Sequence, residues 1–150
     1  MNTRRFGKTG WQVSEVGFGT WNVGGDWGDV SDEAGRMAVH AALDAGTNFL
    51  DTADVYGDGR SERHIAQVLG ERSDDERIYV VTKAGRRLNP HVTEGYNAAN
   101  LDAFVERSRQ NLQQDTLDLV QLHCPPTDVY YNPATFEALE AMVERGWIRH

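Results

Sequence analysis

Four polar side chains of different chemistry stand at the ends of apolar segments of the sequence. Asp51, Lys83 and His123 each close such a segment, and Tyr56 comes five residues after Asp51. An ammonium beside a phenol favours the phenolate, so that the phenol becomes a better proton donor. A carboxylate keeps the ammonium charged and oriented, and an imidazole donates a second hydrogen bond. Such a group would polarise a carbonyl and protonate its oxygen while a hydride reaches its carbon.

Each of these residues has an ordinary structural interpretation when it is taken singly. An aspartate at a strand end is usually a cap, a lysine a solvated charge, a histidine or tyrosine a packing residue. The joint arrangement is harder to explain that way, because burying Asp51 and Lys83 near a phenol without pairing them is costly. The pattern therefore favours a catalytic site without a metal; His64 and His91 lack the spacing of metal ligands.

Apolar runs alternate with helical patterns along the chain. Strands are predicted at 16–20, 48–51, 78–83, 117–123 and 147–150. Their starts lie about 30 to 40 residues apart, the length of a strand, a helix and two loops. Because parallel strands end at the same edge of a sheet, this alternation brings the four polar groups to one rim.

The helices between these strands have recognisable apolar faces. The first is predicted to begin at the N-cap residue Ser31 and to stop at Gly46. We expect each face to pack on the sheet. The faces are Ala34, Ala38, Ala41 and Ala45 in the first helix, Ile65, Val68 and Leu69 in the second, Leu101, Phe104, Val105 and Leu112 in the third, and Phe136, Leu139 and Val143 in the fourth.

Two α/β architectures fit the alternation, an open doubly wound sheet and a (β/α)8 barrel. Residues 17–22 (GFGTWN) lack the third glycine of the dinucleotide-binding fingerprint, which favours the barrel. A barrel takes about 250 residues. The sequence thus predicts one domain over 1–150, the first half of a (β/α)8 barrel, with a β-hairpin over 3–14, four strand–helix units and the start of a fifth strand.

A half barrel would leave two strand edges and an inner face open. The edge of 16–20 and the inward side chains Phe18, Phe49 and Val81 would be exposed, which favours self-association. The net charge of −8 disfavours nucleic acids and anionic membranes as partners, because both require a basic surface. The single cysteine, Cys124, and the lack of a signal-peptide pattern favour a reducing cytoplasm.

The segments that carry these groups resemble the aldo-keto reductase family. They are LDTADVYG at 50–57 with the following Ser61-Glu62, VTK at 81–83, LDLVQLH at 117–123, VGFGTW at 16–21 and GWIRH at 146–150. The resemblance implies that Asp51, Tyr56, Lys83 and His123 form the family's catalytic tetrad. The tryptophan- and glycine-rich loop after residue 21, and Cys124-Pro-Pro, are similar to a bacterial branch of broad-specificity reductases.

The family resemblance also implies a cofactor and a reaction. It predicts NADPH-dependent reduction of aldehydes or ketones, with Thr20, Trp21 and Asp51 at the nicotinamide half of the cofactor. Trp21, Tyr56 and His123 would contact the substrate, and Trp27 would help to wall its pocket. Two other functions stay open: a non-catalytic regulatory subunit that binds the cofactor, as in some channel-associated relatives, and an inactive half-barrel fragment.

Overall fold

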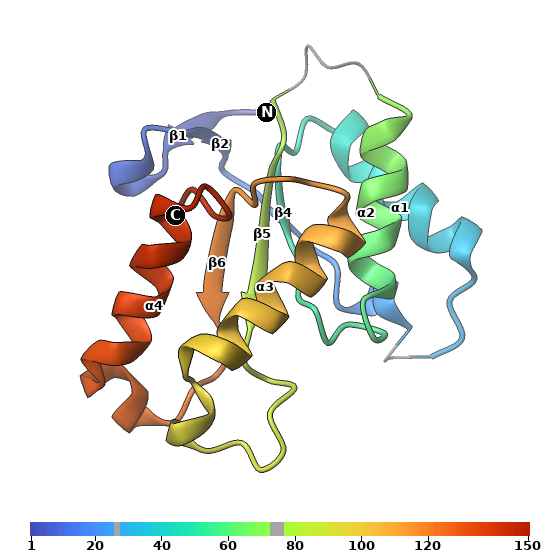
Figure 1. The fold of residues 1–150 in the computed structure, drawn as a ribbon. Coiled ribbons are helices and arrows are strands. Elements are labelled where there is room, and N and C mark those ends of the chain that lie inside the picture. Colours follow the sequence, from blue (N-terminus) through green and yellow to red (C-terminus); the bar gives the residue numbers. More distant parts are fainter. Residues whose placement is uncertain (26–27, 73–76) are drawn as a thin grey trace.

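The computed structural model describes residues 1–25, 28–72 and 77–150. A parallel sheet of order β3–β4–β5–β6 carries four helices along one side, and an antiparallel hairpin lies at one end (Figure 1). The strands are β1 (Thr3–Arg5), β2 (Gln12–Ser14), β3 (Phe18–Gly19), β4 (Phe49–Asp51), β5 (Tyr79–Ala84) and β6 (Leu119–Leu122). The helices are α1 (Asp32–Asp44), α2 (Arg60–Gly70), α3 (Ala98–Leu112) and α4 (Pro133–Glu144).

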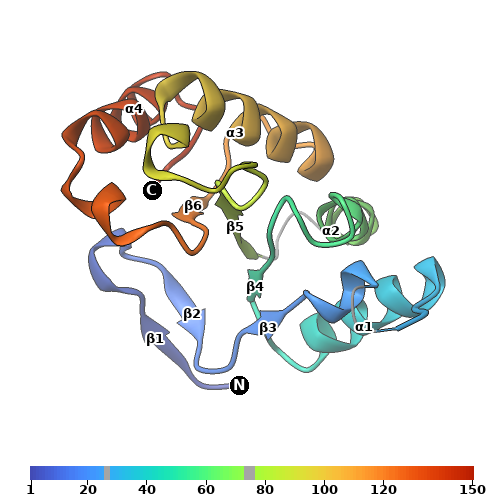
Figure 2. The ribbon, with the colours of Figure 1, turned by 90° about the horizontal axis from the view of Figure 1, so that it is seen from below.

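The order of the strands confirms the predicted half barrel. Seen along the strands, the sheet is curved, and the four helices form an arc on its outer side (Figure 2). The predicted fifth strand is present as a short extension, in which Ile148 pairs in parallel with Leu117 beside β6. The strands are shorter than predicted: β3 has only Phe18 and Gly19, so the edge that we expected to be long is short.

The register of the strands sets how far along the sheet each polar group lies. Asp51 lies opposite Gly19 on one side and Val81 on the other, and Lys83 lies opposite Gln121. All four strands are parallel and therefore end at the same edge, which we call the rim.

The core lies between the sheet and the helices. Because neighbouring side chains of a strand point to opposite faces, Leu50 and Val80 point away from the face that carries Asp51 and Lys83. They are fully or almost fully buried against the helices. The larger members of the core from the helices are Val39, Leu43, Ile65, Val68, Leu101, Val105, Leu112 and Met142.

Two of the predicted helix faces are only partly correct, since one residue of each, Ala38 and Leu139, packs against the core. In α1 the buried residues are Gly35, Val39 and Leu43. They lie next to the predicted face of four alanines rather than on it. Larger apolar side chains release more free energy on burial than alanines do, and Gly35 allows the helix to approach His64 closely. The predicted faces of α2 and α3 do pack on the core, with Leu69 and Phe104 partly buried.

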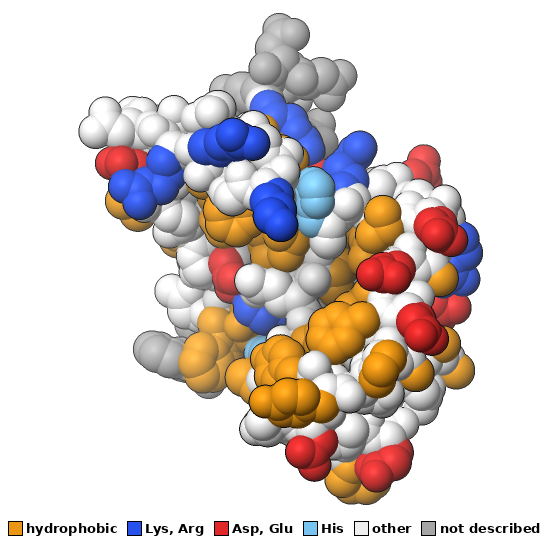
Figure 3. Space-filling model, turned by 90° about the vertical axis from the view of Figure 1, so that its left-hand side faces the viewer, with side chains coloured by type: hydrophobic (Ala, Val, Ile, Leu, Met, Phe, Trp, Pro, Cys, Tyr) orange, Lys and Arg blue, Asp and Glu red, His pale blue; other side chains and the backbone are white. Residues whose placement is uncertain are grey.

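In α4 the buried residues are Thr135, Ala138 and Met142. Phe136 and Val143 remain 38% and 43% exposed, on the predicted but open face. Hydrophobic side chains gather on this side of the molecule, which is seen in Figure 3. The physical reason is that the apolar face of α4 adjoins the open side of the sheet, where the described chain places nothing against it.

The hairpin closes the end of the sheet that is opposite the rim. Trp11 stacks on Tyr79 of β5 with 4.5 Å between ring centroids, and Phe6 packs against Phe49 of β4 at 5.2 Å. Val81 is only 1% exposed, so the expectation of a bare inner face is wrong at this residue. No helix within the described residues is both long and apolar enough to cross a membrane.

The aromatic contact between hairpin and sheet should contribute measurably to stability. Replacing Trp11 by alanine removes its stacking on Tyr79, and we expect a loss of about 2 to 4 kcal/mol in the free energy of unfolding. Urea denaturation measures it. Val16→Ala, at a residue 60% exposed, is the control and should change stability by less than about 0.5 kcal/mol. Equal midpoints for Trp11→Ala and the wild type would show that the hairpin is not coupled to the sheet.

Candidate active site

The rim brings together all four residues of the predicted tetrad. Asp51 is the last residue of β4, Lys83 is the last but one of β5, and His123 directly follows β6. Tyr56 lies in the turn between β4 and α2. The tetrad therefore comes from three neighbouring strands, as the periodicity of the sequence requires.

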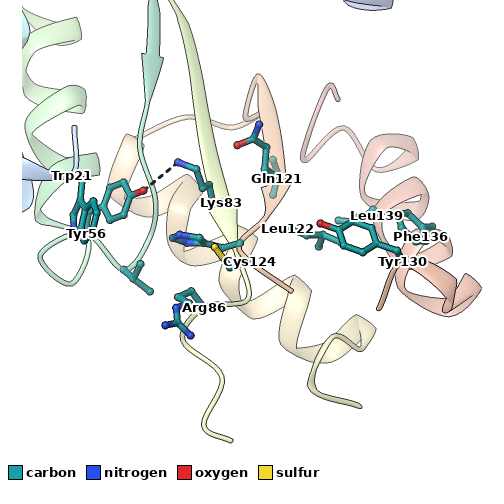
Figure 4. Close-up of a pocket in the computed structure, with 13 residues that line it drawn as sticks. Trp21, Tyr56, Lys83, Arg86, Gln121, Leu122, Cys124, Tyr130, Phe136 and Leu139 are labelled. Atoms are coloured by element: carbon teal, nitrogen blue, oxygen red, sulfur yellow. Dashed lines mark hydrogen bonds between the residues drawn. The ribbon is translucent and has the colours of Figure 1, made fainter. Parts of the chain in front are cut away.

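Lys83 is the centre of the group. Its ammonium donates to the Asp51 carboxylate at 2.5 Å, to the backbone carbonyl of Thr52 at 2.8 Å, and to the Tyr56 hydroxyl oxygen at 3.4 Å (Figure 4). An ammonium has three N–H donors, and each has an acceptor here. Because the Tyr56 oxygen accepts from Lys83, its own hydrogen is free to point toward another acceptor.

The Tyr56 ring is held between other side chains and a neighbouring loop. Its plane lies nearly parallel to Trp21, with 6.0 Å between ring centroids, and His123 meets it edge-on at 5.8 Å. Behind it, a side chain on Gly24 would come within 2.7 Å of the Tyr56 backbone. Only glycine allows the loop after β3 to approach so closely. The loop after β3 and the turn that carries Tyr56 therefore hold the phenol in place together.

His123 is uncharged at neutral pH. Burial lowers the pKa of its imidazole to about 4, and the charges of Lys83 and Arg86 act in the same direction. A neutral imidazole has one N–H donor. Its buried Nδ1 has no hydrogen-bond partner within the described part of the chain. The ring is thus available to donate to a ligand without carrying a charge.

The structure places two of the predicted cofactor residues in different environments. Thr20 is fully buried, and its hydroxyl donates to the backbone carbonyl of Asp51 at 3.0 Å. Trp21 is 49% exposed. A cavity of about 400 Å³ is lined by these residues together with Gly19, Asn22, Asp51 and Tyr56. Trp27, which we expected to wall the substrate pocket, lies outside the described residues.

A larger cleft of about 970 Å³ opens on the other side of the phenol. Tyr56 and Lys83 stand at one end of it, and Tyr130, Phe136 and Leu139 at the other (Figure 4). The sequence did not indicate these last three as site residues. Phe136 and Leu139 belong to the predicted apolar face of the fourth helix, which we expected to pack on the sheet, and Tyr130 had no sequence signal.

A buried carboxyl group near the tetrad, that of Asp54, was not identified from the sequence. Asp54 is fully buried, and neither of its carboxylate oxygens has a partner within the described residues. Burial raises the pKa of Asp54 to about 7, and the Glu62 carboxylate adds to the rise. No group of three metal-binding side chains was found when the described residues were searched.

Fold and site together define a class of protein: a half of a (β/α)8 barrel that carries a tyrosine, a lysine, an aspartate and a histidine at its rim. A sequence model of the Aldo/keto reductase family matches residues 15–150. The chain belongs to this family.

Several relatives are similar over almost the whole chain. An aldo-keto reductase of Bacillus subtilis is 33% identical over 143 residues, 94% of this chain and 43% of the relative. The 6-dehydroglucose reductase of Novosphingobium aromaticivorans is 34% identical over 97% of this chain and 49% of its own length. A probable voltage-gated potassium channel subunit beta of Arabidopsis thaliana is 28% identical over 98% and 44%.

Solved structures agree with the sequence relatives. The holo form of an aldo-keto reductase from Bacillus halodurans superimposes with a TM-score of 0.83 at 32% identity, covering 100% of this chain and 49% of that one. An aldo-keto reductase from Klebsiella pneumoniae in complex with NADPH matches with a TM-score of 0.77 at 30% identity, over 99% and 48%. The chain spans about half the length of the relatives it matches.

The buried Asp54 should make stability depend on pH. An unfolded chain ionises this carboxyl near pH 4, whereas the folded chain keeps its proton until about pH 7. Stability is therefore lost as the pH rises through this window. We expect Asp54→Asn to raise the free energy of unfolding at pH 8 by on the order of 4 kcal/mol, and to leave it nearly unchanged at pH 4. Urea denaturation at both pH values measures it; identical differences at the two would contradict a protonated Asp54.

Proposed function

We propose that the rim reduces aldehydes or ketones to alcohols with NADPH, in a barrel whose remaining strands are supplied. The observation that carries the proposal is the contact of the Lys83 ammonium with the Tyr56 oxygen, at a position where both residues line a cleft. A phenol that accepts a hydrogen bond from a cation is prepared to give up its proton.

Each of the four rim residues would have a distinct role in the reduction. A carbonyl oxygen in the cleft accepts hydrogen bonds from the Tyr56 hydroxyl and from the neutral His123 ring. NADPH, when bound, supplies the hydride to the carbonyl carbon. As that C–H bond forms, the π electrons move to the oxygen, which takes the Tyr56 proton. Lys83 stabilises the phenolate that is left, Asp51 keeps Lys83 in place, and solvent returns the proton.

The smaller cavity suits the nicotinamide end of the cofactor. Asn22 and Asp51 offer amide and carboxylate groups to a carboxamide, and the exposed Trp21 offers a flat surface to a ring. None of the six residues that line this cavity is basic. We infer that the phosphates are held elsewhere, by loops that follow later strands. A cytoplasmic location belongs to the same proposal, since NADPH and the single free Cys124 both fit a reducing compartment.

A second function has one specific observation in its favour. The Arabidopsis relative, whose name describes a potassium channel subunit, is similar to 98% of this chain. A regulatory subunit would bind the cofactor without needing rapid turnover. The two functions differ in one measurement: a reductase oxidises NADPH when an aldehyde is added, and a regulatory subunit only binds it.

The proton donor is the residue to test first. The chain is joined to the C-terminal half of the Bacillus subtilis relative, and NADPH oxidation is followed with a panel of small aldehydes and ketones. We expect Tyr56→Phe to lower kcat by about 10² to 10⁴, because a general acid contributes about that much. Cofactor affinity, measured by quenching of Trp21 fluorescence, should stay nearly unchanged.

Tyr79→Phe is the matched control, because this tyrosine stacks on Trp11 far from the rim. It should leave kcat within about twofold of the unsubstituted protein. If Tyr56→Phe turned over at the same rate as Tyr79→Phe, Tyr56 would not be the acid. If the unsubstituted protein bound NADPH but reduced no carbonyl, the regulatory function would be favoured.

We also propose that the isolated chain associates with itself through its open side. In support, β3 is paired on one side only within the described residues, Tyr130 and Phe136 are exposed where they line the cleft, and Val143 is exposed on the same helix as Phe136. Exposed apolar surface and unpaired edges favour association. Sedimentation at low micromolar concentration should show dimers or larger species. A monodisperse monomer that unfolds cooperatively would contradict this proposal, and Phe136→Ser should shift the equilibrium toward monomer.

A further inference from the structure

The first turn of α2 carries two polar residues that are completely buried. Ser61 and Glu62 are both 0% exposed. Helix α2 lies on the outer side of the sheet, next to the neighbouring helices of the arc (Figures 1 and 2). Buried polar groups are tolerated only where they have partners, and burying a carboxylate is especially unfavourable. The contacts of these two residues therefore indicate what they hold.

Ser61 connects the ends of two strands. Its hydroxyl lies 2.7 Å from the Thr20 hydroxyl and 3.1 Å from the Thr20 carbonyl oxygen, just beyond β3. It also lies 2.9 Å from the hydroxyl of Thr52, just beyond β4. All three residues are fully buried. The three hydroxyls form one network that joins α2 to both strand ends.

Glu62 connects the same helix to the next strand. One carboxylate oxygen accepts from the Thr82 hydroxyl of β5 at 2.6 Å. The other accepts from the side-chain amide of Asn111 in α3 at 2.8 Å. Both oxygens of Glu62 are therefore occupied, which compensates in part for the burial of its charge. Ser61 and Glu62 together reach β3, β4, β5 and α3.

The residues that they hold are the immediate neighbours of the tetrad. Thr52 follows Asp51 in the chain, and Thr82 precedes Lys83. Successive side chains of a strand point to opposite faces, so α2 holds Thr82 from outside while Lys83 points inward. Thr52 has a second connection, because its carbonyl oxygen accepts from the Lys83 ammonium at 2.8 Å. The ends of β4 and β5, which carry Asp51 and Lys83, are thus fixed from the helix side of the sheet.

We propose that Ser61 and Glu62 are positioning residues of the active site. Through Thr52 and Thr82 they set the position of the Lys83 ammonium between Asp51 and Tyr56. The inference rests on the proposed reductase function for its catalytic consequence, and on the hydrogen bonds alone for its structural one. Since a misplacement of about 1 Å costs about 10² in rate, loosening this connection should lower kcat rather than weaken binding.

The first test follows the Lys83 ammonium directly by heteronuclear NMR in the isolated chain. In the wild type its N–H signals should be protected from exchange with water, because three acceptors surround it. We expect Ser61→Ala and Glu62→Gln to shift these signals and to speed their exchange at least about tenfold. Unchanged signals in both variants, with the fold intact by circular dichroism, would overturn the proposal. If one variant does not fold, the other decides.

The second test separates positioning from general loss of stability. Ser14→Ala is the matched control, since Ser14 is a buried serine in β2 of the hairpin, opposite the rim, where its hydroxyl donates to the Val16 carbonyl. It should leave the Lys83 signals in place even where it lowers the unfolding midpoint. Thr52→Val removes the Ser61 partner while it keeps the shape of the side chain. The double variant Ser61→Ala/Thr52→Val should exchange less than about twofold faster than Ser61→Ala alone, because the two substitutions remove the same contact. Fully additive effects would contradict the pathway through Thr52.

The third test measures kinetics in the completed barrel described above. We expect Ser61→Ala and Glu62→Gln to lower kcat about 10²-fold with KM and cofactor affinity changed less than about threefold. A rise in KM at unchanged kcat would overturn the positioning role. The failures are distinguishable: if the unsubstituted barrel shows no turnover, the proposed function fails, while the NMR result on Lys83 still decides the structural inference.

Discussion

The hydrogen bonds of one ammonium group hold the candidate site together. Lys83 donates to Asp51, to the Thr52 carbonyl and to the Tyr56 oxygen, and its side chain is only 14% exposed. A charge in such a place is stable only when its partners are fixed, because desolvation costs several kcal/mol. The parallel register of β4 and β5 fixes Asp51 beside Lys83, and the turn that follows β4 places Tyr56. The sheet is therefore the part of the structure on which the chemistry of the phenol depends.

Behind the inner face lies a second polar layer, between the strand ends and the first turn of α2. It consists of hydroxyls and a carboxylate that are fully buried and hydrogen-bonded, in a region that an apolar core could have filled. One neighbouring group is in an unfavourable place: burial and the Glu62 charge raise the pKa of Asp54 to about 7, and its carboxylate oxygens have no hydrogen-bond partner within the described residues. Natural proteins keep such arrangements where geometry matters more than stability.

The open side of the molecule has a different character. Apolar side chains of α4 and the segment before it line one end of the cleft, and the phenol and ammonium line the other (Figure 4). The same cleft thus joins the site to the surface that a second half barrel would cover. This continuity is in keeping with solved relatives of about twice the length.

The sequence by itself determined the alternation of strands and helices, the half barrel with its hairpin, and the rim residues Asp51, Tyr56, Lys83 and His123. These follow from apolar runs that alternate with helical periods of about four residues, and from position at or just after a strand end, all of which are local. The tertiary structure alone decided which face of α1 and α4 is buried. It also decided that Ser61, Glu62 and Asp54 lie in the interior. Their burial depends on the angle at which each helix meets the sheet, and on partners such as Thr82 and Asn111 that are far away in the chain.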